Sequence, residues 1–285
     1  MGRIVNIDGK LYTPDEAKVS VFDHGFLFGD SIYETMRTYG GKIFLLDRHL
    51  QRLANSAEML RLQLPMSSAE LERELNRSIA AASNDECYLR LIVTRGIGSI
   101  GLDMDLSKHP TYIAIVNPFA PLGSELYANG VKIAIVSTRR NDLSTLSPRI
   151  KSSNLLNNVL AYMEAKTVGA FEGILCNMAG YVSEATGSNV FMVRHGKLHT
   201  PSLDCGLLEG VTRDLVIELA ARETLALEER KITPEELLSC EECFITSTTK
   251  AILPVNQIND IKLFGVPGPL THKLMVAYDA FVRQI

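Results

Sequence analysis

The sequence has no tryptophan, only five cysteines, and no apolar run near the roughly 20 residues that a membrane span requires. An odd number of cysteines in a chain of 285 residues argues against a disulfide framework and favours a reducing compartment. The first residues, MGRIVNIDGKLYT, lack the apolar stretch of a signal peptide, and Asn6 stands where a myristoylation signal has Ser or Thr. We therefore expect a cytoplasmic protein without a membrane segment.

The sequence also lacks a strong charge of either sign. Its net charge is −4 and its isoelectric point is near 5.9, so it carries no electrostatic footprint for nucleic acid or for an anionic membrane. With 46% hydrophobic and 22% charged residues, the composition is that of an ordinary globular protein. We expect neither nucleic acid nor a membrane as a partner.

Strands and helices alternate along the sequence without an internal repeat, which predicts a mixed α/β fold of the α+β kind. The segment NPFAPLGSE, residues 117–125, contains two prolines and a glycine and is typical of a linker. We expect a small N-terminal α/β domain over 1–117, a linker over 118–125 and a larger C-terminal α/β domain over 126–285.

Local signals mark several elements. Capping boxes at 67–70 and 233–236 predict the starts of two helices, the second with a proline at its first helical position. A turn at Gly40 and Gly41 predicts a hairpin over 30–46. A last amphipathic helix is predicted from about Thr271 to the C-terminus.

Two segments match known motifs but have simpler structural interpretations. GIGSIG at 96–101 matches a dinucleotide fingerprint, but Pro110 breaks any helix that would follow, so a flexible glycine loop is the better interpretation. CEEC at 240–243 is a single pair that cannot close a tetrahedral metal site, and we expect small packed residues at a helix-to-strand junction. The histidines show no ligand spacing, so we predict no metal; we expect His24, His49 and His195 in turns or on the surface.

Lys151 stands out because it precedes a predicted helix in the segment SPRIKSSNLLNNVLAYMEAK. We expect Ser152 or Ser153 to cap that helix and its apolar residues to be mostly buried. The positive end of a helix disfavours an ammonium and should lower the pKa of the lysine. A lysine in such a place is suited to form a Schiff base with a carbonyl compound.

Three other segments supply complementary chemistry. Glu184 stands alone among small polar residues before a hydrophobic strand, residues 210–212 open a predicted helix, and residues 247–249 end a strand with three hydroxyls. A helix N-terminus and a row of hydroxyls both suit an anion. An amine, a lone carboxylate and two phosphate cradles are the groups that bind pyridoxal 5'-phosphate, whose ring nitrogen needs the carboxylate.

These segments resemble the class IV aminotransferases, the pyridoxal-phosphate enzymes of fold type IV. That family comprises branched-chain aminotransferases, D-amino-acid aminotransferases, (R)-amine transaminases and aminodeoxychorismate lyase. The resemblance covers essentially the whole chain through FDHGFLFGDSIYET, HLQRL, YLRLIVTRG, IKSSNLLNN, GYVSEATGSNVF, LLEGVTRD and FITSTTKAILPV. It implies a two-domain D-amino-acid-aminotransferase-like fold with the cofactor between the domains. It also implies a homodimer in which the loop RGIGSIGLD lines the pocket of the partner.

The resemblance implies roles for individual residues. Lys151 would form the Schiff base and move the proton at the substrate Cα. Glu184 would pair with the pyridine nitrogen. The phosphate would be held by four residues: Arg52, Val211, Thr212 and Thr248.

Substrate residues are expected on two strands. Alternation along a strand places Tyr33 and Arg37 on one face, and likewise Tyr88 and Arg90. The tyrosines would form apolar walls for an aliphatic side chain, and the arginines could bind a carboxylate. With Thr249, these four are the predicted substrate-binding residues.

The resemblance leaves the substrate open. YLR followed by GIGSIGLD is similar to the branched-chain enzymes, which predicts transfer from Leu, Ile or Val to a 2-oxo acid such as 2-oxoglutarate. Leu155 and TSTT are instead similar to the D-amino-acid enzymes, although no RxH carboxylate trap follows Arg95. D-Ala or D-Glu transamination is the alternative, followed by an aminodeoxychorismate lyase. A cofactor-free binding protein would require Lys151 and Glu184 both to be incidental.

Overall fold

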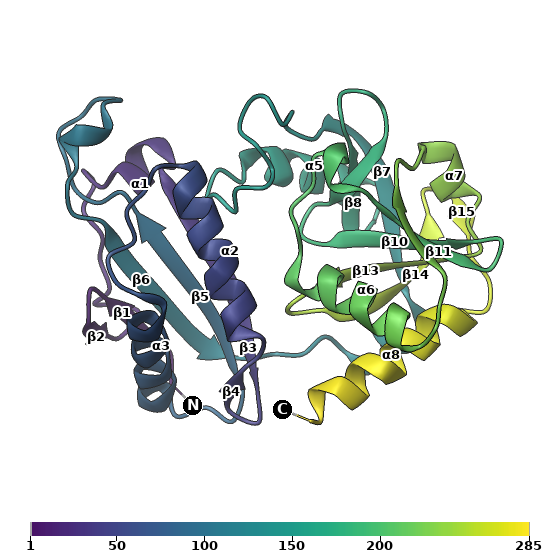
Figure 1. The fold of residues 1–285 in the computed structure, drawn as a ribbon, viewed down its shortest axis with the longest axis horizontal. Coiled ribbons are helices and arrows are strands. Elements are labelled where there is room, and N and C mark those ends of the chain that lie inside the picture. Colours follow the sequence, from purple (N-terminus) through teal and green to yellow (C-terminus); the bar gives the residue numbers. More distant parts are fainter. Residues whose placement is uncertain (1, 285) are drawn as a thin grey trace. The chain divides into compact units, whose positions relative to one another are not determined.

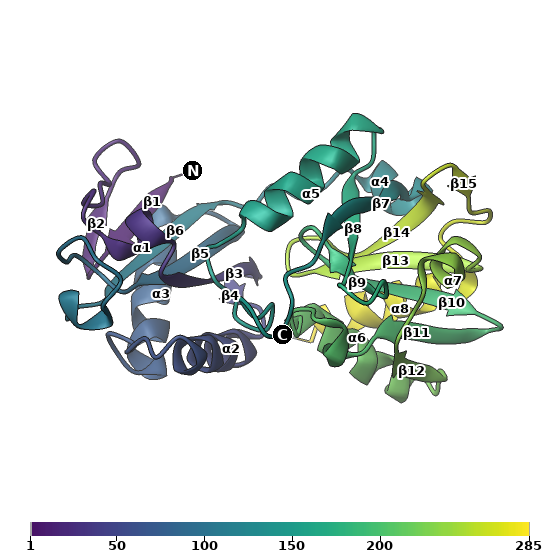
Figure 2. The same cartoon turned by 90° about the horizontal axis from the view of Figure 1, so that it is seen from above.

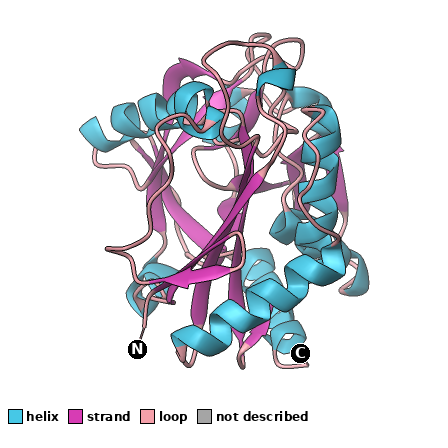
Figure 3. Cartoon of the chain, turned by 90° about the vertical axis from the view of Figure 1, so that its left-hand side faces the viewer, coloured by secondary structure: helices cyan, strands magenta, loops and turns pink. Residues whose placement is uncertain are grey.

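The computed structural model describes residues 2–284, which form two compact units (Figure 1). Unit 1 contains the chain up to Ala120 together with Ile150–Asn154, and unit 2 contains Pro121–Arg149 and Leu155–Gln284. Helices and strands are mixed throughout the chain (Figure 3). The segment around Lys151 therefore packs with unit 1, whereas the predicted domain 126–285 would have included it.

Unit 1 is an antiparallel sheet with helices on one face. Its strands are β1 (Ile4–Ile7), β2 (Lys10–Tyr12), β3 (Ser31–Tyr39), β4 (Lys42–Ile43), β5 (Cys87–Thr94) and β6 (Thr111–Pro118), in the order β2-β1-β6-β5-β3-β4. Its helices are α1 (His24–Phe28), α2 (Leu46–Met59) and α3 (Ser68–Ala82), with a 3₁₀ turn η1 (Met104–Leu106). In Figure 2, α2 and α3 lie on the same face of this sheet.

The core of unit 1 lies between that sheet face and the two helices. Ile32 and Met36 of β3 pack there with Leu89 of β5, Leu53 of α2 and Leu71 of α3. Strand alternation then directs the neighbouring side chains to the opposite face of the sheet. The four strand residues predicted to bind substrate, Tyr33, Arg37, Tyr88 and Arg90, belong to that opposite face.

Unit 2 contains a nine-stranded sheet. Its strands are β7 (Val131–Arg139), β8 (Glu172–Cys176), β9 (Val182–Ala185), β10 (Asn189–Arg194), β11 (Lys197–Pro201), β12 (Leu227–Arg230), β13 (Glu242–Ser247), β14 (Ala251–Ile258) and β15 (Ile261–Lys262). The order is β12-β11-β10-β13-β14-β7-β8-β9, and β15 pairs with β14. The other elements are α4 (Ser124–Asn129), α5 (Leu156–Thr167), η2 (Leu203–Cys205), α6 (Val211–Arg222), α7 (Pro234–Leu238) and α8 (Pro269–Val282). Helix α5 packs on β7 and β8, and α6 and α8 pack together against β13 (Figure 2).

The local signals in the sequence are confirmed at several places. Both capping boxes are formed, with Ser67 before α3 and Thr233 before α7. The β3–β4 hairpin turns at Gly40 and Gly41, where φ is +58° and +77°. Glycine is needed there because other residues adopt positive φ only at an energetic cost.

Two expectations about α5 were wrong. The helix begins at Leu156, its N-cap is Leu155, and no side chain caps it. Its apolar residues are largely exposed: Leu156 by 69% and Met163 by 59%. The last helix, α8, starts at Pro269, close to the predicted start near Thr271.

Between residues 2 and 284, no helix is long and apolar enough to cross a membrane. The same residues contain no group of three or more His, Cys, Asp or Glu side chains placed to hold a metal ion.

Candidate active site

Lys151 lies on a short extended segment beside β3. The backbone N–H of Tyr33 donates to the Lys151 carbonyl at 2.9 Å, and the N–H of Ser153 donates to the carbonyl of Ser31 at 3.0 Å. The N–H of Lys151 donates to the buried hydroxyl of Ser56 in α2 at 3.1 Å. The backbone of Lys151 is therefore fixed from two sides. Helix α5 starts five residues after Lys151. Because a helix dipole acts only within about the first turn, the dipole of α5 does not act on the Lys151 amine as the sequence suggested.

The amine of Lys151 and the guanidinium of Arg90 both lie close to the ring of Tyr33. Its Nζ lies 4.6 Å from the ring centroid of Tyr33, and Cζ of Arg90 lies 4.0 Å from the same centroid. Burial raises the pKa of Tyr33, although the charge of Arg90 acts in the opposite direction. The structure thus brings together three of the predicted residues around one neutral ring.

Arg37 and Tyr88 are cross-strand neighbours on the same sheet face. The register of β3 and β5 pairs Arg37 with Tyr88 and Thr35 with Arg90, so the faces that strand alternation predicts for each strand form one face of the sheet. The guanidinium of Arg37 lies between two rings, with its Cζ 3.8 Å from the centroid of Tyr39 and 3.7 Å from that of Phe119. Stacking therefore holds this arginine in place beside Tyr88.

Arg52 belongs to a buried network that the sequence did not reveal. Its Nε and Nη2 donate to the two carboxylate oxygens of Glu34 at 2.8 and 2.7 Å, and Nδ1 of His49 lies 2.8 Å from Glu34 Oε2. Burial alone would raise the pKa of Glu34, but the charge and hydrogen bonds of Arg52, with the hydrogen bond of His49, lower it to about 2. Glu34 is therefore ionised, and it fixes the guanidinium of Arg52.

His49 is neutral in this network. Burial lowers its pKa more strongly than the Glu34 carboxylate raises it. An ionised carboxylate can only accept, so Nδ1 carries the proton and Nε2 is an acceptor. Nε2 is buried without a hydrogen-bond partner in the described part of the chain.

In unit 2, Glu184 is a buried carboxylate on β9. Its Oε1 accepts from Nε of Arg140 at 2.8 Å, and its Oε2 accepts from the N–H of Leu208 at 3.1 Å. Arg140 directly follows β7 and also donates to Oδ1 of Asn157 in α5 at 3.4 Å. The Glu184 carboxylate is thus oriented by groups from two segments, and Asn157 of α5 contacts the arginine that pairs with it.

The start of α6 is packed closely against β10. A Cβ at Gly210 would lie 2.0 Å from Oδ1 of Asn189, so only glycine fits without displacing a neighbour. The first N–H groups of a helix, here those of Val211 and Thr212, have no partner within the helix. The hydroxyl of Thr212 is buried and finds no hydrogen-bond partner among residues 2–284.

Thr248 and Thr249 lie in the turn between β13 and β14. Ser247 precedes the turn, and its buried hydroxyl has no hydrogen-bond partner within the described residues. The residue after the turn, Ala251, has a φ of +52°. Unit 2 therefore presents hydroxyls at Ser247 and the following turn, and a hydroxyl with helix N–H groups at the start of α6. Both kinds of group suit an anion.

Glu34, His49 and Arg140 are the polar residues of this region that sequence reasoning missed. Glu34 lies on the same face of β3 as the core residues Ile32 and Met36, so a charged residue at a core position was the signal available in the sequence. Arg140 gave no local signal, because it meets Glu184 only through the pairing of distant strands.

The histidine expectations were partly wrong. His24 and His49 are buried, and Nε2 of His24 lies 3.0 Å from the carbonyl oxygen of Ser99. His195 lies in a turn with a φ of +52°, as expected. Buried histidines cannot be separated from exposed ones by sequence spacing alone when their partners are distant in the chain.

The two rejected motifs have structural explanations. A Cβ at Gly96 would lie 1.9 Å from the carbonyl oxygen of His109, and one at Gly98 would lie 2.4 Å from that of Leu106. These glycines therefore permit close packing of the loop. Cys240, between α7 and β13, and Cys243, within β13, are buried free thiols in a core cluster.

Comparison with known proteins places the chain in a family. The model of the class IV aminotransferases matches residues 31–258. A putative branched-chain-amino-acid aminotransferase of Methanocaldococcus jannaschii is 39% identical over 90% of this chain and 88% of its own length. A D-alanine aminotransferase of Bacillus licheniformis is 36% identical over 96% of this chain and 95% of its own length.

A solved structure agrees with these relatives. The branched-chain aminotransferase of the archaeon Thermoproteus uzoniensis, determined with norvaline, matches with a TM-score of 0.91 and 33% identity, covering 98% of this chain and 94% of that one. The chain therefore belongs to the class IV aminotransferases and has the mixed α/β architecture of fold type IV. It is an aminotransferase that depends on pyridoxal 5'-phosphate, and its substrates are small amino acids and 2-oxo acids.

Proposed function

We propose that this enzyme transfers the amino group of Leu, Ile or Val of the L series to a 2-oxo acid such as 2-oxoglutarate. The proposal rests on the surroundings of the Tyr33 ring. The centroid of this ring lies 4.6 Å from Nζ of Lys151 and 4.0 Å from Cζ of Arg90. An aliphatic side chain would pack on Tyr33 and Tyr88, and Arg90 or Arg37 would bind a carboxylate. The 39% identical relative from M. jannaschii, named as a putative branched-chain enzyme, supports the same substrates.

The residues of both units fit the cofactor. The buried hydroxyls of Thr212 and Ser247 have no hydrogen-bond partner within the described residues, and phosphate oxygens would accept their hydrogen bonds. We assign the phosphate to Arg52, Val211, Thr212 and Thr248, and the ring nitrogen to Glu184. When bound, pyridoxal 5'-phosphate supplies a ring that withdraws electrons from the substrate Cα.

The residues of the chain would then perform the proton chemistry. The Lys151 amine would remove the proton from the substrate Cα and, in the same half-reaction, donate it to the cofactor carbon; in the second half-reaction it would move a proton in the reverse direction. Glu184, held by Arg140 at 2.8 Å, accepts a hydrogen bond from the protonated ring nitrogen. Tyr33 keeps the lysine on the face of the sheet where substrate residues lie.

A D-amino-acid transaminase is the second candidate. Leu155 and the TSTT segment favour it, as does the 36% identical D-alanine aminotransferase of B. licheniformis. In that case Arg37 or Arg90 would have to anchor the substrate carboxylate. An aminodeoxychorismate lyase would use the same lysine without a second half-reaction.

We further infer a homodimer in the cytoplasm. Ile100 and Leu102, in the loop after β5, are 70% and 88% exposed, and the apolar residues of α5 are exposed as well. Apolar surface of this kind is typical of a protein interface. The five cysteines are buried free thiols, which fits a reducing compartment.

Replacing the lysine tests the proposal. Lys151→Ala should lower the rate of L-leucine transamination by more than about 10³-fold, because it removes both the amine and the acid–base group. The variant should still bind the cofactor, without the absorbance of the covalently linked form. Lys166→Ala, at an exposed lysine in the last turn of α5, is the control. Full transaminase activity in Lys151→Ala would contradict the assignment.

A further inference from the structure

Glu172, the first residue of β8, is a buried carboxylate that the proposed chemistry does not use. Its side chain is only 4% exposed. Its Oε1 accepts from the hydroxyl of Ser188 at 2.7 Å, and its Oε2 accepts from the N–H of Gly187 at 2.7 Å and the hydroxyl of Thr186 at 3.1 Å. One carboxylate thus binds all three residues of the turn 186–188 between β9 and β10.

Lys250 joins a second turn to the same carboxylate. Its Nζ lies 2.9 Å from Oε1 of Glu172 and 3.3 Å from the hydroxyl of Ser188. Lys250 is the last residue of the turn 248–250, and its carbonyl accepts from the hydroxyl of Tyr127 at 3.2 Å. The Glu172–Lys250 ion pair therefore fastens the turn that carries Thr248 to the turn 186–188.

The turn 186–188 is itself tied to the start of α6. Glu184 lies just before this turn and accepts from the N–H of Leu208, while Asn189 lies just after it and donates to the Leu208 carbonyl at 2.9 Å. Leu208 lies two residues before Gly210, the N-cap of α6. The turn 248–250 is thus connected to the turn 186–188 through Glu172, and the residues flanking the turn 186–188 connect it to the start of α6.

We propose that Glu172 and Lys250 are positioning residues for the phosphate of the cofactor. They hold the Thr248 hydroxyl in a fixed relation to the first turn of α6, and they need not touch the cofactor. The inference rests on the proposed function, because it takes the cofactor phosphate as the anion. Removing the Lys250 charge leaves the Glu172 carboxylate buried without its cation, and removing the Glu172 charge releases the half-buried Lys250 amine, so in either case the turn 248–250 would rearrange.

Cofactor affinity tests this role in the apoenzyme of the whole chain. Lys250→Met and Glu172→Gln should each weaken the binding of pyridoxal 5'-phosphate by about tenfold or more. Binding of pyridoxal, which lacks the phosphate, should change by less than about twofold, because its ring contacts do not depend on the turn. Dissociation constants come from absorbance titrations, at a temperature where circular dichroism shows each apoenzyme folded. In the double variant, the loss of binding free energy for pyridoxal 5'-phosphate should be smaller than the sum of the losses in the two single variants.

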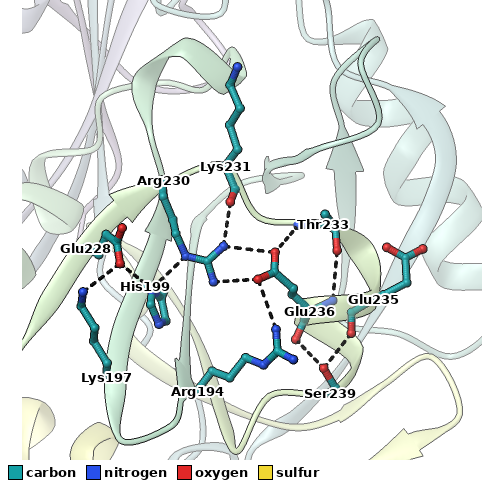
Figure 4. Close-up of polar contacts among 10 residues, drawn as sticks. All are labelled: Arg194, Lys197, His199, Glu228, Arg230, Lys231, Thr233, Glu235, Glu236 and Ser239. Atoms are coloured by element: carbon teal, nitrogen blue, oxygen red, sulfur yellow. Dashed lines mark hydrogen bonds and ion pairs between the residues drawn. The ribbon is translucent and has the colours of Figure 1, made fainter.

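Two residues in a polar cluster of the same unit provide matched controls (Figure 4). Lys197 donates to Glu228 at 2.8 Å, and the Glu236 carboxylate lies between Arg194 and Arg230, at 3.2 and 2.9 Å. Lys197→Met and Glu236→Gln remove the same charges but should leave both dissociation constants unchanged.

Several outcomes would overturn the inference. Equal losses for pyridoxal 5'-phosphate and pyridoxal, or no loss for either, would mean that the pair serves fold stability only. If Glu172→Gln failed to fold, Lys250→Met would decide alone, since this lysine is 20% exposed. Failure of the wild-type chain to bind pyridoxal 5'-phosphate would instead contradict the proposed function itself.

Discussion

At the scale of single residues, the most informative group is the carboxylate of Glu34. It lies on the core face of β3, where alternation predicts an apolar side chain, and it is fully buried. Such a carboxylate is tolerated only when it is paired and hydrogen-bonded, and here Arg52 and His49 satisfy it. The same contacts orient the guanidinium that we assign to the cofactor phosphate.

This network predicts how stability depends on pH. The pKa of folded His49 is lowered from 6.5, so below about pH 6.5 the unfolded chain binds a proton that the folded chain does not. Stability is therefore fully present above that pH and is lost as the pH falls. In wild type we expect the free energy of unfolding to fall through this residue as the pH is lowered below about 6.5.

His49→Gln should remove that part of the loss, because glutamine does not titrate. The check is urea denaturation of both proteins at pH 7, 6 and 5, with His272→Gln at an exposed histidine as the control. The same slope against pH in wild type and His49→Gln would contradict the account. At lower pH, Glu34 adds a second loss, because its folded pKa of about 2 lies below the unfolded value of 4.5.

At the scale of elements, the start of α6 depends on one glycine. Gly210 has a φ of −82°, which any residue can adopt, so the constraint is the space occupied by Asn189. An added Cβ would push the first turn of α6 away from β10 and separate its N–H groups from the turn 248–250.

Gly210→Ala should therefore lower the free energy of unfolding by about 1–3 kcal/mol and also weaken cofactor binding. For the unfolding measurement, Gly187→Ala is the control, since its Cβ would meet Glu172 and Lys250 only at 3.7 Å, an ordinary contact, and its stability should not change. Denaturant unfolding and a cofactor titration measure the two effects. Unchanged stability in Gly210→Ala would mean that β10 and α6 are not packed as closely as described.

Elements also differ in how far the sequence could predict them. The starts of α3 and α7 depend on residues three positions apart, so their capping boxes were visible in the sequence. The start of α5 depends instead on the segment 150–154, which pairs with β3 more than 110 positions earlier in the chain. The apolar periodicity of α5 indicated a buried face, but periodicity cannot distinguish a core from an exposed apolar surface.

At the scale of the whole molecule, the alternating pattern and the resemblance predicted the family and the mixed architecture. They also predicted that Tyr33 shares a strand face with Arg37, and Tyr88 with Arg90, because strand alternation is a local property. The register of β3 and β5 then places both pairs on one sheet face. They did not predict the partners of the charged residues. Arg52 with Glu34, Arg140 with Glu184 and Lys250 with Glu172 are joined by sheet pairing and helix packing between distant segments, which no local pattern encodes.

A single half-reaction shows directly whether the enzyme accepts the amino group of a branched-chain L-amino acid, as we propose. The purified enzyme with bound cofactor is mixed, without a 2-oxo acid, with L-leucine, D-alanine or D-glutamate in separate experiments. The account predicts a rapid change of the cofactor absorbance to that of pyridoxamine 5'-phosphate with L-leucine only. Rapid conversion with D-alanine or D-glutamate and none with L-leucine would contradict it, and would make the protein a D-amino-acid transaminase that anchors the substrate carboxylate through Arg37 or Arg90.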